Sequence, residues 1–387
     1  MTVAGMLLVN DPGTWSAIYD PLEHAAWHGW TPTDLIFPFF LFIVGITTQL
    51  SIAWRRERGD DEGAIRRQIL KRGALIFLFG LLINGFPFFT WGAVPGNPDP
   101  SFLDRVVDRL LNWRIMGVLQ RIGIAYIISA LIATRATLRT QVIITATILL
   151  VYWFVMTVLP VPGTNGTPGA LLLGRGATTM AGYWDRVLLD WSRFGLGNHL
   201  WINSRSWDPE GILSTAGAVG TALLGNLAGR WIGQPRPLIE RIAGLFAAGS
   251  IAIMLGSMWH WSFPINKSLW TSSYALFTGG VAAVSLATIM WLVDHVNWRW
   301  WTKPFVVYGV NPMVAFVGSA IMARLIYSIL KVDLNGQQVS LQNWIYQTTF
   351  ASWLSPMNAS LAFAVAFVTF WFAVLALLYR KNIFFRV

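Results

Sequence analysis

Long apolar runs separated by short polar segments dominate the pattern of this chain. They lie at about 35–54, 73–93, 115–134, 141–160, 211–229, 242–259, 270–293, 304–328 and 359–379, with a shorter run at Thr2–Val9. Runs of this length predict helices that cross the ~30 Å hydrocarbon core of a bilayer. The pattern therefore predicts an all-α, polytopic integral membrane protein with about ten transmembrane helices around a central cavity.

The first run is the exception, because a helix of that length covers only ~14 Å. Its shortness leaves open whether the native N-terminus is longer than Met1. No basic segment follows Met1, so no cleavable signal peptide is expected. We find no soluble domain, no internal repeat and no low-complexity tract, and we expect one membrane domain over residues 1–387.

Composition agrees with a membrane protein. The chain of 387 residues is 55% hydrophobic and 12% charged, with 22 Trp, whereas a soluble domain would carry roughly twice that charged fraction. There is no cysteine, which excludes disulfides and thiolate chemistry. The net charge of +10 is explained by basic cytoplasmic loops rather than by nucleic-acid binding.

The distribution of basic residues predicts the orientation. The segment Arg55–Arg72 holds seven Lys and Arg, which marks it as cytoplasmic by the positive-inside rule. Alternating from there, the inside segments carry 17 basic residues and the outside segments 9, although the outside loops are longer. Both termini are therefore expected in the cytoplasm, with Asn10 and His24 on the far side of the membrane.

Four local patterns refine this picture. The outer loop 161–209 is too long to lack structure, and Met180–Phe194 predicts a short amphipathic helix at the membrane interface. Asp208-Pro209-Glu210-Gly211 is typical of a helix start. Small residues four apart over Gly217–Gly229 predict close helix packing, within one chain or between two copies in a homodimer. Asn311-Pro312 predicts a break inside a span.

The stretch Glu23–Pro38 places two histidines and a carboxylate directly before a long apolar run. A titratable cluster at the mouth of a membrane helix is costly, so we expect it to serve function. His24 is a candidate general base for an amine or hydroxyl that attacks a thioester, or a carrier of the acyl group; otherwise it is an interfacial histidine. Asp34 is either its partner or only a helix cap. Further ligands near His24 and His28 are lacking, so no metal is expected.

Two further groups are candidates for binding. Arg121 lies inside an apolar span and needs an anionic partner, such as a phosphate, Asp34 or a substrate group; a structural ion pair is the alternative. Asn266 and Lys267 stand beside Trp270 at an external helix start. That combination suits a sugar, whose ring stacks on Trp, although a capped interfacial turn would look the same.

Several blocks resemble the transmembrane acyltransferases typified by lysosomal heparan-α-glucosaminide N-acetyltransferase. The most specific is the pattern H-x-x-W-x-G-x-T-x-x-D-L-x-F-P-x-F that starts at His24. Weaker blocks follow the family order at Val9-Asn10, Leu119–Gly123, Asp208–Gly211, Asn266–Trp270 and Gly309–Asn311. Together they span almost the whole chain.

The resemblance implies an acetyl-CoA-dependent transferase without a metal. It would move an acetyl group from cytoplasmic acetyl-CoA to an amino sugar or sugar hydroxyl on the far side of the bilayer. The lysosomal enzyme's luminal domain is missing, which favours a multi-pass protein of a bacterial inner membrane. The catalytic residues implied are His24, Asp34 and Asn10. The substrate- or cofactor-binding candidates are Gln120, Arg121, Asn266, Lys267, Trp270 and Asn311.

A transporter for an amino sugar or related solute is the competing interpretation, because it would have the same polar cavity and broken helix without chemistry. The sequence leaves open the acceptor, the acyl length and whether the enzyme works through an acyl-enzyme or a ternary complex.

Overall fold

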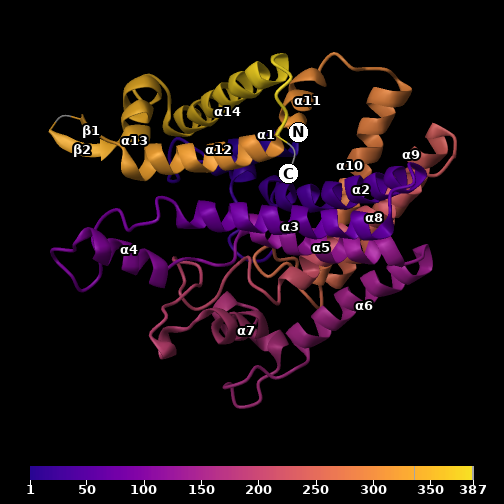
Figure 1. Cartoon of the computed structure of the whole chain (residues 1–387), viewed down its shortest axis with the longest axis horizontal. Helices are drawn as coiled ribbons and strands as arrows, with labels where there is room; N and C mark the ends of the chain where they lie inside the picture. Colours follow the sequence, from indigo (N-terminus) through magenta and orange to yellow (C-terminus); the bar gives the residue numbers. More distant parts are fainter. Residues whose placement is uncertain (335, 386–387) are drawn as a thin grey trace.

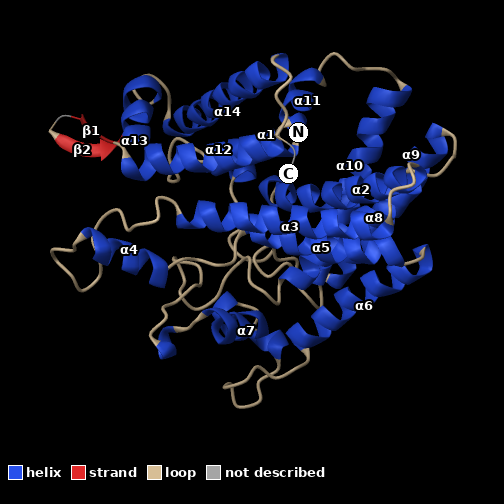
Figure 2. Ribbon diagram, viewed as in Figure 1, coloured by secondary structure: helices blue, strands red, loops and turns tan. Residues whose placement is uncertain are grey.

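Helices make up almost all of the regular structure (Figure 2). The structure, a computed structural model, describes residues 1–334 and 336–385. Residue 335 and the last two residues, at the end predicted to be cytoplasmic, lie outside the described part. The described sheet is one antiparallel hairpin of β1 (Lys331–Leu334) and β2 (Gln337–Ser340). The all-α expectation is confirmed.

The long helices form two groups (Figure 1). The larger group holds α2 (Ile36–Glu57), α3 (Glu62–Gly85), α5 (Val118–Arg135), α6 (Leu138–Thr157), α8 (Thr215–Ile232), α9 (Leu238–Trp259) and α10 (Ser272–Met290). The smaller group holds α1 (Thr2–Asn10), α11 (Lys303–Val310), α12 (Pro312–Arg324), α13 (Leu341–Ile345) and α14 (Pro356–Arg380). Outside both lie α4 (Phe102–Leu111) and α7 (Met180–Leu189). Helix α1 contacts both α2 and α14, so it lies where the groups meet.

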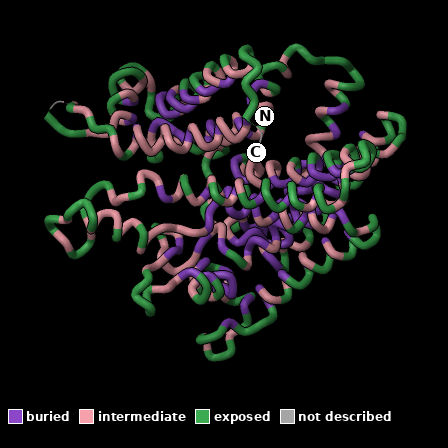
Figure 3. The backbone as a smooth tube through the Cα atoms, in the orientation of Figure 1, coloured by how far each residue is buried: buried purple, intermediate pink, exposed green. Residues whose placement is uncertain are grey.

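Within the described residues, eight helices are long and apolar enough to cross a membrane. Large apolar side chains on these helices, such as Ile43, Ile143, Ile251 and Phe370, are exposed, as lipid-facing side chains would be. Exposed positions lie along the periphery of the backbone in Figure 3. This arrangement supports a multi-pass membrane protein. The two other expected spans are the nine-residue α1 and α8, most of which is buried among its neighbours. The number of ten therefore stays a prediction.

The small-residue stripe of α8 packs within the chain. A Cβ atom on Gly225 would lie 2.1 Å from the carbonyl oxygen of Phe42, and one on Gly45 would lie 2.1 Å from that of Ala222. Only glycine lets the backbones of α2 and α8 approach this closely. The stripe thus gives the homodimer no support.

Three local predictions can be compared with the structure. The helix in the outer loop is present as α7, ending at Leu189. The break at Asn311 is confirmed, since α11 ends at Val310 and α12 begins at Pro312. The prediction that a helix starts at Asp208 was wrong. Helix α8 begins at Thr215, and the carboxylate of Asp208 instead binds an arginine.

Candidate active site

His24 and Asp34 lie in direct contact. His24 belongs to the loop before α2, and Asp34 belongs to the 3₁₀ turn Pro32–Leu35 that leads into this helix. The Nδ1 atom of His24 is 2.7 Å from Oδ1 of Asp34. An ionised carboxylate can only accept, so Nδ1 carries the proton and Nε2 keeps a free lone pair. The side chain of His24 is 45% exposed and that of Asp34 is 1% exposed.

Asp34 also holds the loop in place. Its Oδ2 atom accepts hydrogen bonds from the backbone N–H groups of Ala25 and Thr31, each at 3.0 Å. The predicted cap between Thr31 and Asp34 is therefore present together with the contact to His24. Asp34 is thus both a helix cap and the partner of His24, because Oδ2 makes the cap and Oδ1 contacts the imidazole.

Lys267 completes the cluster from a distant part of the chain. Its Nζ atom is 3.0 Å from both ring nitrogens of His24 and 3.6 Å from Oδ1 of Asp34. Burial lowers the pKa of Lys267, and the charges of Asp34 and Glu210 act in the opposite direction. This cation lies where it could meet negative charge that develops beside His24.

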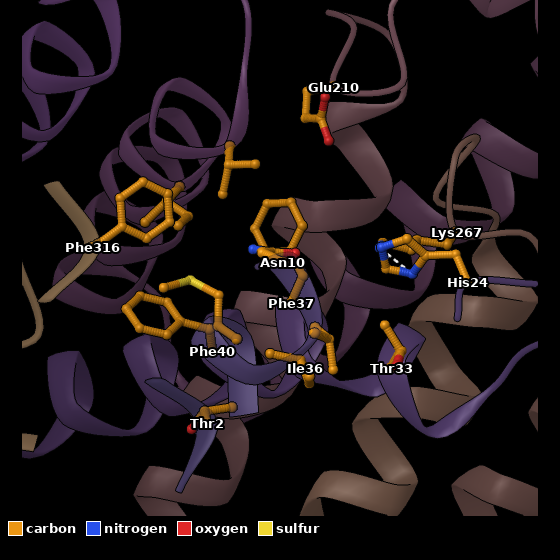
Figure 4. A pocket seen from close by; sticks show the side chains of 14 residues that line it. Thr2, Asn10, His24, Thr33, Ile36, Phe37, Phe40, Glu210, Lys267 and Phe316 are labelled. Atoms are coloured by element: carbon orange, nitrogen blue, oxygen red, sulfur yellow. Dashed lines mark hydrogen bonds between the residues drawn. The ribbon is translucent and has the colours of Figure 1, made fainter. Parts of the chain in front are cut away.

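Two cavities meet at this cluster. The first, here called the α1 cavity, has a volume of about 260 Å³ and lies between α1, α2, α5 and α12 (Figure 4). Its lining is mostly apolar and includes Met6, Val9, Ile36, Phe40, Ile122 and Phe316. Asn10 and Glu210 also line it, near the His24–Lys267 pair.

The second, here called the tryptophan cavity, has a volume of about 470 Å³. It is lined by aromatic and charged residues, among them Trp27, Trp201, Trp207, Trp270, Arg114 and Arg121. His24, Lys267 and Glu210 line both cavities. A group bound in one cavity and a group bound in the other would therefore meet at the imidazole.

Glu210 and Arg114 were missed from the sequence. Arg114 binds Glu210 and also Asp208, the latter at 2.6 Å. Burial opposes the ionisation of Glu210, but Arg114, Arg121 and Lys267 outweigh it and bring its pKa below the ordinary value. One indication of this ion pair was present in the sequence, because Asp208 and Glu210 are two acidic residues with no basic residue beside them. A helix start explained the same two residues equally well.

No family model matches the chain. The chain is similar over 99% of its length to heparan-α-glucosaminide N-acetyltransferase of Mus musculus, with 28% identity, and equally to that of Homo sapiens. This similarity supports membership of the heparan-α-glucosaminide N-acetyltransferase family. Both relatives carry the name of an N-acetyltransferase. The chain spans 58% of the length of these relatives.

Of the residues expected from the family resemblance, Asn10, Arg121 and Trp270 line a cavity beside His24. Arg121 is buried and its guanidinium lies 5.2 Å from the ring of Trp270. It donates a hydrogen bond of 3.3 Å to the carbonyl oxygen of Gly211. A pairing of Arg121 with Asp34, one of several partners that the sequence left open, is not among the ion pairs of the described residues.

Three other candidates contact protein groups rather than either cavity in the described part of the chain. Gln120 points at α3, where a Cβ on Gly80 would meet its Oε1 at 2.3 Å. Asn266 donates to the carbonyl of Trp27 at 2.8 Å and so joins the two loops of the site. Asn311 donates to the carbonyl of Ile383 at 2.9 Å. Binding by these residues stays a prediction, and these contacts favour structural roles.

Residues 1–334 and 336–385 contain no group of three or more His, Cys, Asp or Glu side chains that could hold a metal ion.

Proposed function

We propose that the protein transfers an acetyl group from cytoplasmic acetyl-CoA to an amino sugar or sugar hydroxyl on the extracytoplasmic side. The observation that carries this proposal is the position of the His24–Asp34 pair at the junction of two cavities of contrasting chemistry. A transfer between two substrates requires that their reacting atoms meet at one set of catalytic groups, and this junction provides it.

The α1 cavity suits the donor. Its apolar walls of Met6, Ile36 and Phe316 fit the slender arm that carries a thioester. The basic segment Arg55–Arg72 would attract the phosphates of CoA towards the cytoplasmic face. An arm held in the cavity would bring the thioester carbonyl to His24, and orientation supplies much of the acceleration.

The tryptophan cavity suits the acceptor. The rings of Trp27 and Trp207 lie 5.6 Å apart and edge to face, and Trp201 packs on Trp207. Exposed aromatic faces bind the apolar faces of sugar rings, while Glu210 and Arg114 provide hydrogen-bonding partners for hydroxyl or amino groups. The acceptor would reach His24 from this side.

The transfer follows from these positions. Nε2 of His24 takes the proton of the acceptor N–H or O–H as that atom attacks the thioester carbonyl carbon. Asp34 keeps the imidazole in the required tautomer and stabilises the imidazolium that forms. The ammonium group of Lys267, which lies beside the imidazole, would stabilise the oxyanion that develops on the carbonyl oxygen.

The test is acetyl transfer by the purified protein in detergent, with radiolabelled acetyl-CoA and glucosamine. We expect wild-type transfer, and a loss of about 10²- to 10⁴-fold in His24→Ala, the range typical of a lost general base. His28→Ala is the matched control, since His28 lines neither cavity in the described residues. Transfer by His24→Ala at the wild-type rate would refute the assignment, and wild-type protein that neither binds acetyl-CoA nor transfers label would refute the function.

A further inference from the structure

Lys267 and His24 form a pair that is suited to hold one positive charge but not two. The Nζ atom of Lys267 is 3.0 Å from both Nδ1 and Nε2 of His24, so it lies over the face of the imidazole. Two cations at that distance repel each other strongly in a site partly shielded from water. Protonation of His24 during the transfer therefore favours the loss of a proton from Lys267.

The surroundings permit that loss. The charged groups that face Lys267 are the carboxylates of Asp34, at 3.6 Å, and of Glu210, in addition to the imidazole of His24. Burial outweighs both carboxylates, and the pKa of Lys267 lies below its ordinary value. An ammonium group with a lowered pKa is a better proton donor than that of an exposed lysine.

The turn that carries Lys267 fixes its position. Asn266 is fully buried and its Oδ1 atom accepts a hydrogen bond of 2.8 Å from the backbone N–H of Leu269. Trp270, also fully buried, adopts a φ of 47°, which few residues other than glycine adopt. Such a turn persists only where its surroundings hold it, so Lys267 is held beside both cavities rather than free to move.

Resting on the proposed function, we propose that Lys267 is the general acid of the transfer and protonates the departing thiolate of the donor. The bond from the acceptor nitrogen or oxygen to the carbonyl carbon forms as His24 Nε2 takes the acceptor's proton. The bond from that carbon to sulfur then breaks, and sulfur receives a proton from Lys267 Nζ. His24, whose side chain is 45% exposed, then releases its proton to water and Lys267 takes one up, which restores the starting state.

The pair carries one positive charge before and after the transfer, and the second charge that it gains when His24 is protonated is removed when Lys267 gives its proton to sulfur. It begins as a lysine cation beside a neutral imidazole, becomes a neutral amine beside an imidazolium, and returns. The products are the acetylated acceptor and the thiol, so atoms and protons balance without any further reactant. Asp34, which accepts from Nδ1, remains ionised throughout.

The first experiment compares wild-type protein with Lys267→Arg, which keeps the cation but cannot release its proton at ordinary pH. We expect kcat to fall by about a hundredfold or more, while the KM for acetyl-CoA changes little. The wild-type kcat should decline at alkaline pH as Lys267 loses its proton, and the arginine variant should lack that decline. A kcat close to wild type, with an unchanged pH profile, would overturn the proposal.

The second experiment separates proton donation from charge. Lys267→Ala should regain activity when methylamine is added, because a small ammonium ion can occupy the vacated space and donate a proton. Guanidinium, a cation of similar charge that holds its proton, should restore nothing. Equal rescue by both cations would show that Lys267 contributes only its positive charge and no proton, and it would contradict the proposal.

These outcomes remain distinct from failure of the proposed function. If wild-type protein transfers acetyl groups and His24→Ala does not, the function stands whatever Lys267→Arg does. If wild-type protein transfers nothing, the function itself fails.

Discussion

At the scale of single residues, Asp34 links the proposed catalytic histidine to the local fold. One carboxylate oxygen orients His24 and the other accepts two backbone N–H groups of the preceding loop. The backbone carbonyl of the same residue accepts a hydrogen bond from the hydroxyl of Tyr274 on α10. The start of α2, the loop of His24 and α10 therefore converge on one residue.

Asp34→Asn tests this convergence. The amide nitrogen would face groups that donate, so the variant should lose the orientation of His24 and part of the loop's hydrogen bonding. We expect kcat to fall by about 10²- to 10⁴-fold, as for loss of the base itself. Acetyl-transfer kinetics check the prediction, with size-exclusion profiles to verify folding. A folded variant with wild-type kcat would show that His24 needs no carboxylate partner.

At the scale of elements, α7 holds the loop that carries Glu210. The side chain of Asp185 on α7 is fully buried, and its two oxygens accept from the backbone N–H groups of Asp208 and Ile212 at 3.1 and 3.0 Å. Glu210 lies between these two anchor points. The short helix α7 thus holds one wall of the tryptophan cavity in place.

Asp185 gives this anchor a pH dependence. Burial raises the pKa of Asp185 from 3.8 to about 7, so the folded protein binds this proton more tightly than the unfolded chain. The resulting stability is complete below a pH of about 4 and is lost as the pH rises through about 7. We expect the thermal midpoint of the wild-type protein in detergent to fall over that interval.

In Asp185→Asn, the thermal midpoint should fall less between a pH of about 4 and about 7 than it does in the wild-type protein. The difference between the two curves isolates Asp185, because Asp11, another buried carboxyl whose pKa is raised to about 7, remains in both proteins. Parallel curves for wild type and variant would contradict the assignment.

At the scale of the whole molecule, the site lies where two helix groups meet. Helix α1 brings Asn10 to the α1 cavity, α2 begins at the turn of Asp34, and α12 contributes Phe316. The tryptophan cavity is closed by loops on the other side of His24. In the proposed reaction, this layout would give the two substrates separate approaches to one imidazole.

The separation of two residues along the chain decides whether the sequence could predict their contact in the site. His24 and Asp34 are ten residues apart, so a local pattern carried their pairing. The ion pair of Arg114 and Glu210 joins residues 96 positions apart, and no local pattern encodes it. Gln120 and Arg121 are neighbours on α5 that point in different directions, and a uniformly apolar helix does not reveal which face meets the cavity.

The most direct test of the account uses proteoliposomes that contain protein in a known orientation. Acetyl-CoA is enclosed with the face that carries Arg55–Arg72, and glucosamine is supplied to the opposite face, since neither crosses the bilayer unaided. The account predicts labelled N-acetylglucosamine outside the vesicles, and none with His24→Ala. Labelled product only when donor and acceptor share one compartment would contradict transfer across the membrane.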